Sequence, residues 1–326
     1  MRLLKNHLKS ALTWLRFQRE TYRDGRRYLR CVPGPVGNPR HSLAQLESHI
    51  VRRYHVVEKG LSMPDFRPRF GADMIRQLAS MIPQWERESP ETTSPNNQIE
   101  AARAVLRAYL AKHRALGVDI SDILADGPWM GPDPGCGTGG VREYRLPPQE
   151  DREALVRMLN ERCSVRHFDP ELSIDRAAVE RAVAAAIRTP SVCNRQTWRA
   201  HLFEGERAQG LLALQDGNRG FGHTIPAVFV VTSDLRYFTS IHERYQAWID
   251  GGMFAMSLLL GLLAEGYGAV PMNWCVLNER DEELRRTAEI PDFERIIMLI
   301  GFGHPATGCT IPLSQRRPVD DILRVH

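Results

Sequence analysis

The segment RCSVRHF occupies residues 162–168, and the segment PSVCNRQTW follows it at residues 190–198. The first segment gathers two guanidinium groups and a hydroxyl around one short turn: Arg162, Ser164 and Arg166. Guanidinium groups bind phosphate through paired, charge-assisted hydrogen bonds. The second segment carries the side-chain amides of Asn194 and Gln196, which can donate and accept hydrogen bonds at the edge of a ring. Together the segments predict a site for a phosphorylated, planar cofactor.

Composition places the chain among ordinary globular proteins. It has 326 residues, of which 43% are hydrophobic and 25% charged, enough for one large domain or two smaller ones. The net charge of +4 gives no sign of a nucleic-acid partner. The six cysteines show no C-x-x-C spacing, which argues against a zinc site and a disulfide framework and predicts a reducing, cytoplasmic compartment.

The N-terminal residues are basic and amphipathic. Residues 1–30 carry nine Arg or Lys against only Glu20 and Asp24. Residues 3–17 place leucines on one helical face and cations on another, which predicts a helix. Two interpretations remain open: a helix packed on the protein or on a partner subunit, or a helix lying in the plane of a membrane surface. We expect no secretory signal and no transmembrane helix, since the apolar run at 253–264 is too short to cross a bilayer.

The first half of the chain is predicted to be helical. Helices are predicted at 42–60, 71–88 and 96–116, with Gly60 as a residue that ends the first of them. Residues 126–140 are rich in Gly and Pro and predict a linker. They contain a formal G-x-G-x-x-G match, which lacks the preceding strand and following helix that a dinucleotide site needs. We therefore expect a helical region at 1–145 and a second domain at 146–326.

The second half mixes helices and strands without a regular βαβ rhythm, which predicts an α+β fold. Helices are expected at 150–161, 175–188 with Ser173 near its cap, 206–215, 239–265 and 281–288. Strands are expected at 199–204, 227–232, 269–276 and 295–302.

The two opening segments resemble the nitroreductase family of FMN-dependent oxidoreductases, in which R-x-S-x-R and S-x-x-N-x-Q-P-W segments hold the flavin. The resemblance covers about residues 150–320, and Thr197 stands where the family usually has proline. It implies a mixed antiparallel sheet flanked by helices, a homodimer with FMN at its interface, and NADH or NADPH as the electron donor. The flavin-binding residues that it implies in these segments are Arg162, Ser164, Arg166, Pro190, Ser191, Asn194 and Gln196.

Later segments extend the resemblance. Residues 268–274 are similar to the segment whose backbone faces the reactive flavin nitrogen N5, which makes the N–H of Asn273 the implied donor, with Pro271 and Met272 beside the ring. Residues 301–305 resemble the family's closing strand, and Arg316 aligns with its terminal phosphate-binding cation. Asn218 is a further candidate for the pyrimidine edge or the ribityl chain.

His55 and Glu58 lie three residues apart on one face of a predicted helix. They form either a structural hydrogen-bonded pair or part of a substrate pocket. The surrounding H-x-x-E-K-G-L-S sequence is similar to segments ahead of nitroreductase-like domains linked to polysaccharide biosynthesis, and metal binding is not expected here because the H-E-x-x-H spacing is absent.

Three functions remain open at this point. The resemblance favours a flavoenzyme that passes hydride from NAD(P)H to FMN and then to a small acceptor. Reductive dehalogenation or flavin fragmentation would use the same fold. A membrane-peripheral or scaffold protein without activity would explain the basic N-terminus and Thr197.

Overall fold

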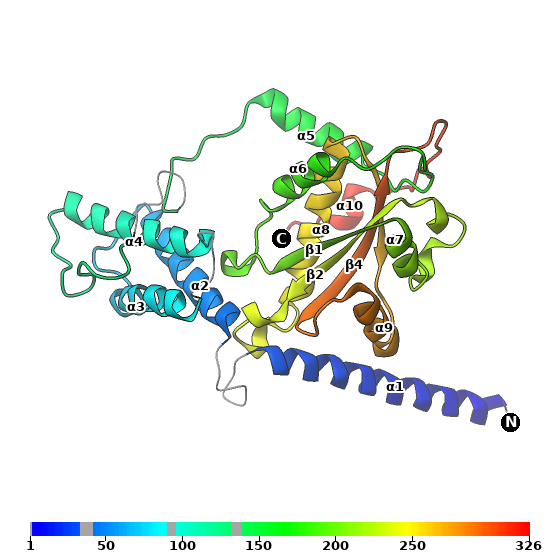
Figure 1. Cartoon of the computed structure of the whole chain (residues 1–326), viewed down its shortest axis with the longest axis horizontal. Helices are drawn as coiled ribbons and strands as arrows, with labels where there is room; N and C mark the ends of the chain where they lie inside the picture. The colour runs from blue at the N-terminus through cyan, green and yellow to red at the C-terminus, as the bar shows by residue number, and fades with distance from the viewer. Residues whose placement is uncertain (1, 33–41, 90–95, 132–138) are drawn as a thin grey trace.

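The computed structural model describes residues 2–32, 42–89, 96–131 and 139–326. It shows a small helical unit beside a larger part that contains the sheet, with a long N-terminal helix running along one side (Figure 1). The sequence-based expectations for residues 33–41, 90–95 and 132–138, which include most of the predicted linker, lie outside the described residues.

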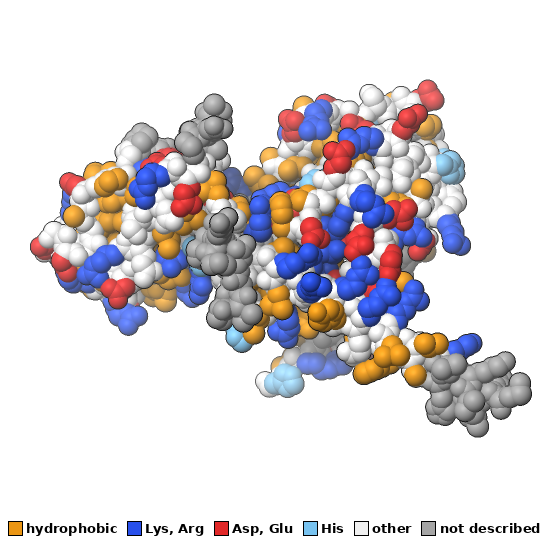
Figure 2. All heavy atoms as spheres, turned by 60° about the horizontal axis from the view of Figure 1, so that its bottom comes forward, with side chains coloured by type: hydrophobic (Ala, Val, Ile, Leu, Met, Phe, Trp, Pro, Cys, Tyr) orange, Lys and Arg blue, Asp and Glu red, His pale blue; other side chains and the backbone are white. Residues whose placement is uncertain are grey.

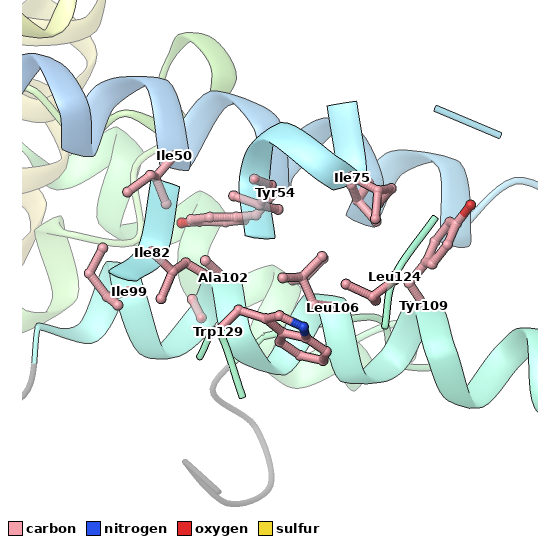
Figure 3. Packing of buried hydrophobic residues seen from close by; sticks show 14 of the residues in the cluster. Ile50, Tyr54, Ile75, Ile82, Ile99, Ala102, Leu106, Tyr109, Leu124 and Trp129 are labelled. Atoms are coloured by element: carbon pink, nitrogen blue, oxygen red, sulfur yellow. The ribbon is translucent and has the colours of Figure 1, made fainter. Parts of the chain in front are cut away.

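The helical unit comprises α2 (Leu43–Leu61), α3 (Ala72–Glu88) and α4 (Asn97–Ala115). Ser42 begins α2 with a capping box, in which its hydroxyl accepts from the Gln45 N–H and the Gln45 side chain accepts from the Ser42 N–H. The three helices share a core of their own, closed by Leu124 and Trp129 from the following turns (Figure 3). The buried Arg103 guanidinium donates to the Trp129 carbonyl and pairs with Glu86.

The sheet has four strands in the order β1-β2-β4-β3, and every neighbouring pair is antiparallel. The α+β prediction is therefore confirmed. The strands are β1 (Trp198–Glu204), β2 (Ala227–Asp234), β3 (Gly268–Asn273) and β4 (Glu294–Gly303). The helices of this half are α5 (Gln149–Glu161), α6 (Arg176–Ala186), α7 (Gly205–Leu212), α8 (Gln246–Ala264), α9 (Asn278–Ala288) and the short α10 (Val319–Ile322).

Apolar side chains cover both faces of this sheet. On one face, α6 and α8 pack over a cluster that includes Phe229, Phe254 and Phe302. On the other face, α7 and α9 enclose a cluster that includes Leu211 and Leu284. Every residue of β2 is buried, as expected for a central strand covered on both sides.

Several predicted boundaries were wrong. The N-terminal helix does not stop at residue 17, because α1 continues from Arg2 to Cys31. The residue capping α6 is Asp175, whose carboxylate accepts from the Ala177 N–H, and not Ser173. Gly60 does not end α2, which continues to Leu61. Its missing side chain instead makes room for Phe70, whose ring would lie 2.2 Å from a Cβ at this position.

The C-terminal half of α1 packs on the sheet-containing part. Tyr28 is buried against Phe238, and its hydroxyl donates to the Ser240 carbonyl at 2.8 Å. Arg27 is also buried and donates to Asp281 at 2.7 Å. The second carboxylate oxygen of Asp281 accepts from the indole N–H of Trp274 at 3.0 Å, so this side chain joins α1 to the residue that follows β3 and Asn273.

Helix α8 is shorter than the helix predicted at 239–265, since residues 241–243 form a separate 3₁₀ turn, and it extends beyond the apolar run at 253–264. Its 19 residues make it long and apolar enough to cross a membrane by length and composition alone, a test that core helices also pass. Half of that window is buried inside the protein, where Phe254, Leu258 and Leu262 pack against the sheet. The packing is that of a core helix.

Candidate functional site

The arginine turn (residues 162–168) lies against β3. Ser164 pairs with Ala269 in an isolated parallel bridge, and the Val165 N–H donates to the Ala269 carbonyl at 3.1 Å. Gly268 allows this approach, because a Cβ there would lie 2.8 Å from the Val165 side chain. The structure thus brings the predicted phosphate-binding segment beside the strand that ends at Asn273.

Two cations of the arginine turn remain available to an anion. The Arg166 guanidinium is exposed and lies 5.8 Å above the Phe221 ring, with a long 3.5 Å contact to the Ser164 carbonyl. Arg162 caps the end of α5 and is half-buried. Neither arginine forms an ion pair with a described acidic residue.

The turn that holds Asn218 reaches the far end of β3. The buried Gln215 side chain donates to the Asn273 carbonyl at 3.1 Å, which fixes the end of the strand. The Asn218 amide nitrogen donates to the Leu212 and Gln215 carbonyls at 2.6 and 2.9 Å. Asn218 therefore shapes this turn, whereas Asn273 itself is exposed and its neighbour Met272 is buried.

The amide loop (residues 190–197) has an unusual backbone. Cys193, Asn194 and Gln196 all have positive φ, at 51°, 56° and 50°. Each non-glycine residue in this region of φ/ψ space costs free energy, and such strain persists where surrounding contacts impose it. The Gln196 side chain donates to the carbonyl and side-chain oxygens of Asn194 at 3.2 and 3.3 Å, so the two predicted ring-edge amides lie together.

Buried polar contacts impose this conformation. The Asp250 carboxylate of α8 accepts from the Val192 N–H at 3.2 Å and from the Gln246 side chain at 2.7 Å. Burial raises the pKa of Asp250 above its ordinary value. The buried Arg195 donates to Glu243 at 2.7 Å. These supporting residues were missed from sequence, although a lone carboxylate inside an apolar helix, Asp250, was a usable signal.

Thr197 stands where the resembled family has proline, and its hydroxyl bonds to the Ser233 hydroxyl at 2.7 Å. The Asp234 N–H donates to the Thr197 carbonyl at 2.8 Å. Contacts with the end of β2 therefore hold the chain here in place of a rigid proline ring.

The helical unit contacts the amide loop through α2. The Asn194 side-chain nitrogen donates to the Tyr54 hydroxyl at 3.3 Å, and the Tyr237 hydroxyl donates to Glu47 at 3.0 Å. On the same helix, His55 Nδ1 lies 3.5 Å from Glu58, which also accepts from the Gly140 N–H at 3.2 Å. His55 and Glu58 are thus paired: His55 directly follows Tyr54, which touches the loop, and Glu58 lies one turn beyond Tyr54.

The arginine turn and the amide loop lie at opposite edges of the sheet. The amide loop leads into β1, and the arginine turn borders β3. The two edges are three strand spacings apart, about 14 Å. The start of β1 and the end of β3 lie at the same end of the sheet. Trp198, the first residue of β1, pairs with Ser233 near the end of β2. The pairing of β2 with β4, and of β4 with β3, places Asn273 at that same end. The remaining candidate, Arg316, lies in the exposed tail and donates to the Ser314 carbonyl.

The chain matches one protein-family model over this region. The model described as the nitroreductase family matches residues 159–212 and 200–304. Residues 159–304 therefore resemble a nitroreductase-family domain, and an N-terminal helical region precedes them. Both the arginine turn and the amide loop lie wholly inside the matched residues.

Individual relatives are distant. Protein DrgA of Synechocystis is 26% identical over 125 residues, which cover 38% of this chain and 56% of that protein, so the chain spans little more than half of this curated relative. A nitroreductase-family protein of Streptococcus pneumoniae is 21% identical and covers 53% of this chain and 100% of its own, with a TM-score of 0.46. A nitroreductase of Desulfovibrio desulfuricans in complex with FMN is 22% identical and covers 53% and 96%, with a TM-score of 0.45.

Proposed function

We propose that this protein is an FMN-dependent oxidoreductase that takes electrons from NADH or NADPH and delivers them to a small acceptor. The observation that carries the proposal is the strained amide loop, which presents Asn194 and Gln196 together inside a nitroreductase-family domain. Backbone strain of this kind gathers at ligand-binding sites, where neighbouring contacts hold it.

The residues present fit the flavin and its phosphate. Arg162, Ser164 and Arg166 would hold the phosphate, because both guanidinium groups lack a described acidic partner. Asn194 and Gln196 would meet the ring edge, with Pro190 and Ser191 beside them. Pro271 and Met272 would lie along the ring, and Asn218 and Arg316 would complete the site.

Two subunits would form each site. Within one chain the arginine turn and the amide loop border opposite edges of the sheet, too far apart for one flavin to be enclosed by both in the same subunit. A two-fold axis would bring the loop of one subunit to the turn of the other. Helix α8 offers a surface for this contact, since Ile249, Met253 and Met256 are exposed on it.

When bound, FMN would supply the redox chemistry: it would accept hydride from NADH or NADPH and pass the electrons to the acceptor in alternating steps. The chain's contribution is to bind and orient it. The backbone N–H of Asn273 would donate to N5, where a fixed donor stabilises the negative charge that develops during transfer. His55 and Glu58, on the helix that touches the amide loop, would help define the pocket for the acceptor. The enzyme would act in the cytoplasm.

The proposal is tested by adding FMN to the purified full chain and removing unbound flavin. We expect a yellow protein whose flavin absorbance is bleached by NADH or NADPH without oxygen and restored by an added quinone. Riboflavin serves as the control, because it lacks the phosphate and should bind more weakly. A protein that retains no FMN, or retains FMN that neither nucleotide reduces, would refute the proposal.

A further inference from the structure

Helix α1 has a packed half and a projecting half. Figure 1 shows its N-terminal half extending past α9, away from the rest of the molecule. One face of the packed half bonds to α9. Glu20 accepts from Asn278, Arg23 pairs with Glu282, and Arg27 pairs with Asp281. The attachment of α1 therefore does not depend on the residues before Arg19.

The opposite face of α1 is apolar and exposed over most of its length. Residues seven apart lie on nearly the same line of a helix, and Leu15, Tyr22 and Leu29 are 55%, 68% and 56% exposed. Leu12 and Trp14 widen this surface in the projecting half, at 57% and 60% exposed. Figure 2 shows hydrophobic side chains exposed along this helix, beside the N-terminal atoms drawn in grey. We call these five residues the α1 stripe.

The charge along the projecting half of the α1 stripe is of one sign. Residues 1–19 contain five Lys or Arg and no Asp or Glu. Arg19 and Arg26, also seven apart, border the stripe and are exposed, and Arg19 pairs with Glu279. A second copy of α1 would bring like charges together along its edges, which opposes self-association. An anionic membrane surface can bury the apolar face and attract the cations at the same time.

The aromatic residues suit an interface between water and lipid. Trp14 and Tyr22 each combine a large apolar ring with a polar group, and such residues concentrate at the level of lipid headgroups. The apolar sector is also broad, since Trp14 and Leu12 lie on either side of the line through Leu15 and Tyr22. A lipid surface accommodates a broad sector, whereas a paired helix needs only a narrow seam.

We propose that α1 binds the surface of an anionic phospholipid membrane, lying in its plane with the α1 stripe in the lipid and the α9-facing side toward the protein. The sheet-containing part would then sit directly above the headgroups. This proposal is independent of flavin binding, because it uses no residue of the proposed redox site.

The test is flotation of the full chain with vesicles of phosphatidylcholine, alone or mixed with phosphatidylglycerol, at low and high salt. We expect binding to the anionic vesicles, little binding to the neutral ones, and release at high salt. The variant Leu12→Gln/Leu15→Gln should bind at least about tenfold less, because two leucines leave the lipid. Leu313→Gln, at a fully exposed leucine of the C-terminal tail, is the matched control and should bind as the parent does.

Both substitutions lie on exposed side chains, so thermal unfolding should be unchanged and a loss of binding cannot be assigned to misfolding. No binding to anionic vesicles at low salt would overturn the proposal, as would equal binding by the Leu12→Gln/Leu15→Gln variant. If the parent instead forms a larger oligomer that this variant dissolves, a second copy covers the stripe and the lipid proposal is wrong. Equal binding to neutral and anionic vesicles would overturn the requirement for anionic lipid.

Discussion

The side-chain amide of Asn194 donates to the hydroxyl of Tyr54 at 3.3 Å across 140 residues of sequence. Tyr54 lies in the core of the helical unit, and Asn194 lies in the strained amide loop, within the residues that match the nitroreductase-family model. Tyr54 also donates to Gln98, and burial raises its pKa well above the ordinary value, so it stays protonated at neutral pH. The helical unit thus reaches the loop through a neutral hydroxyl.

Replacing Tyr54 by Phe tests this link. We expect the free energy of unfolding to fall by about 1–3 kcal/mol, because the hydrogen bonds with Asn194 and Gln98 are both lost and each contributes about 0.5–1.5 kcal/mol. FMN affinity should fall several-fold, because Asn194 loses a partner that holds it. Tyr109→Phe is the control for a lost buried hydroxyl, since it removes one hydrogen bond, to the Phe70 carbonyl at 2.8 Å, within the core of the helical unit. Equal effects of both variants on FMN titrations would contradict the link.

The arginine turn should recognise phosphate specifically. Arg166→Gln is expected to weaken FMN binding by about tenfold to a hundredfold, since a hydrogen bond to a charged group contributes about 1.5–3 kcal/mol. Riboflavin binding should hardly change, because riboflavin carries no phosphate. Fluorescence titration measures both affinities, and Arg152→Gln on α5 controls for the lost positive charge. Equal losses for FMN and riboflavin would assign Arg166 another role.

Hybrid dimers can show whether two subunits share each site. Arg166→Gln and Asn194→Ala chains with different tags are expressed together, and the mixed dimer is isolated on both tags in turn. If each site combines the turn of one subunit with the loop of the other, one site is intact and one is doubly altered. We expect about half the FMN of the parent. If turn and loop of the same chain formed a site, no intact site would remain.

Asp250 should make stability depend on pH. Its pKa is raised by burial, so the folded chain holds the proton more tightly than the unfolded chain does. The resulting stabilisation is complete below the ordinary carboxyl pKa and is lost as the pH rises through the raised value. Asp250→Asn removes this dependence, so the parent should lose stability relative to the variant between pH 4 and neutral pH in urea unfolding. A constant difference across that range would show that Asp250 does not titrate in it.

Two glycines should respond to alanine in opposite directions. Gly60→Ala places a Cβ 2.2 Å from the Phe70 ring, and we expect a loss of about 1–3 kcal/mol from overpacking. Gly25→Ala in α1 meets nothing within 4 Å and should stabilise the helix by about 0.5–1 kcal/mol. Thermal unfolding measures both changes. Stabilisation by Gly60→Ala would mean that Phe70 moves aside at little cost.

Local patterns predicted most elements of this fold. The helix predicted at 42–60 agrees with α2 within one residue at each end, and the apolar run at 227–232 lies inside β2. The full length of α1 could not be read in this way. Residues such as Arg27 look like solvent-exposed cations until folding brings Asp281, 254 residues away in sequence, against them.

The candidate site, like the fold, could be predicted from the sequence only in part. The spacing of Arg162, Ser164 and Arg166 singles out a binding segment, but only the parallel bridge to Ala269 shows that it borders β3. Sequence gives no strand order, so it could not show that the amide loop lies at the opposite edge of the sheet. Asp250 and Tyr54 were missed because their roles arise from tertiary contacts with the loop.

The position of β1 and β3 at the two outer edges of the sheet bears on how activity should scale with protein concentration. A flavin held between chains is lost when the chains separate, so a single chain in dilute solution would be inactive. Turnover per chain should therefore increase with enzyme concentration and level off once nearly all chains are associated.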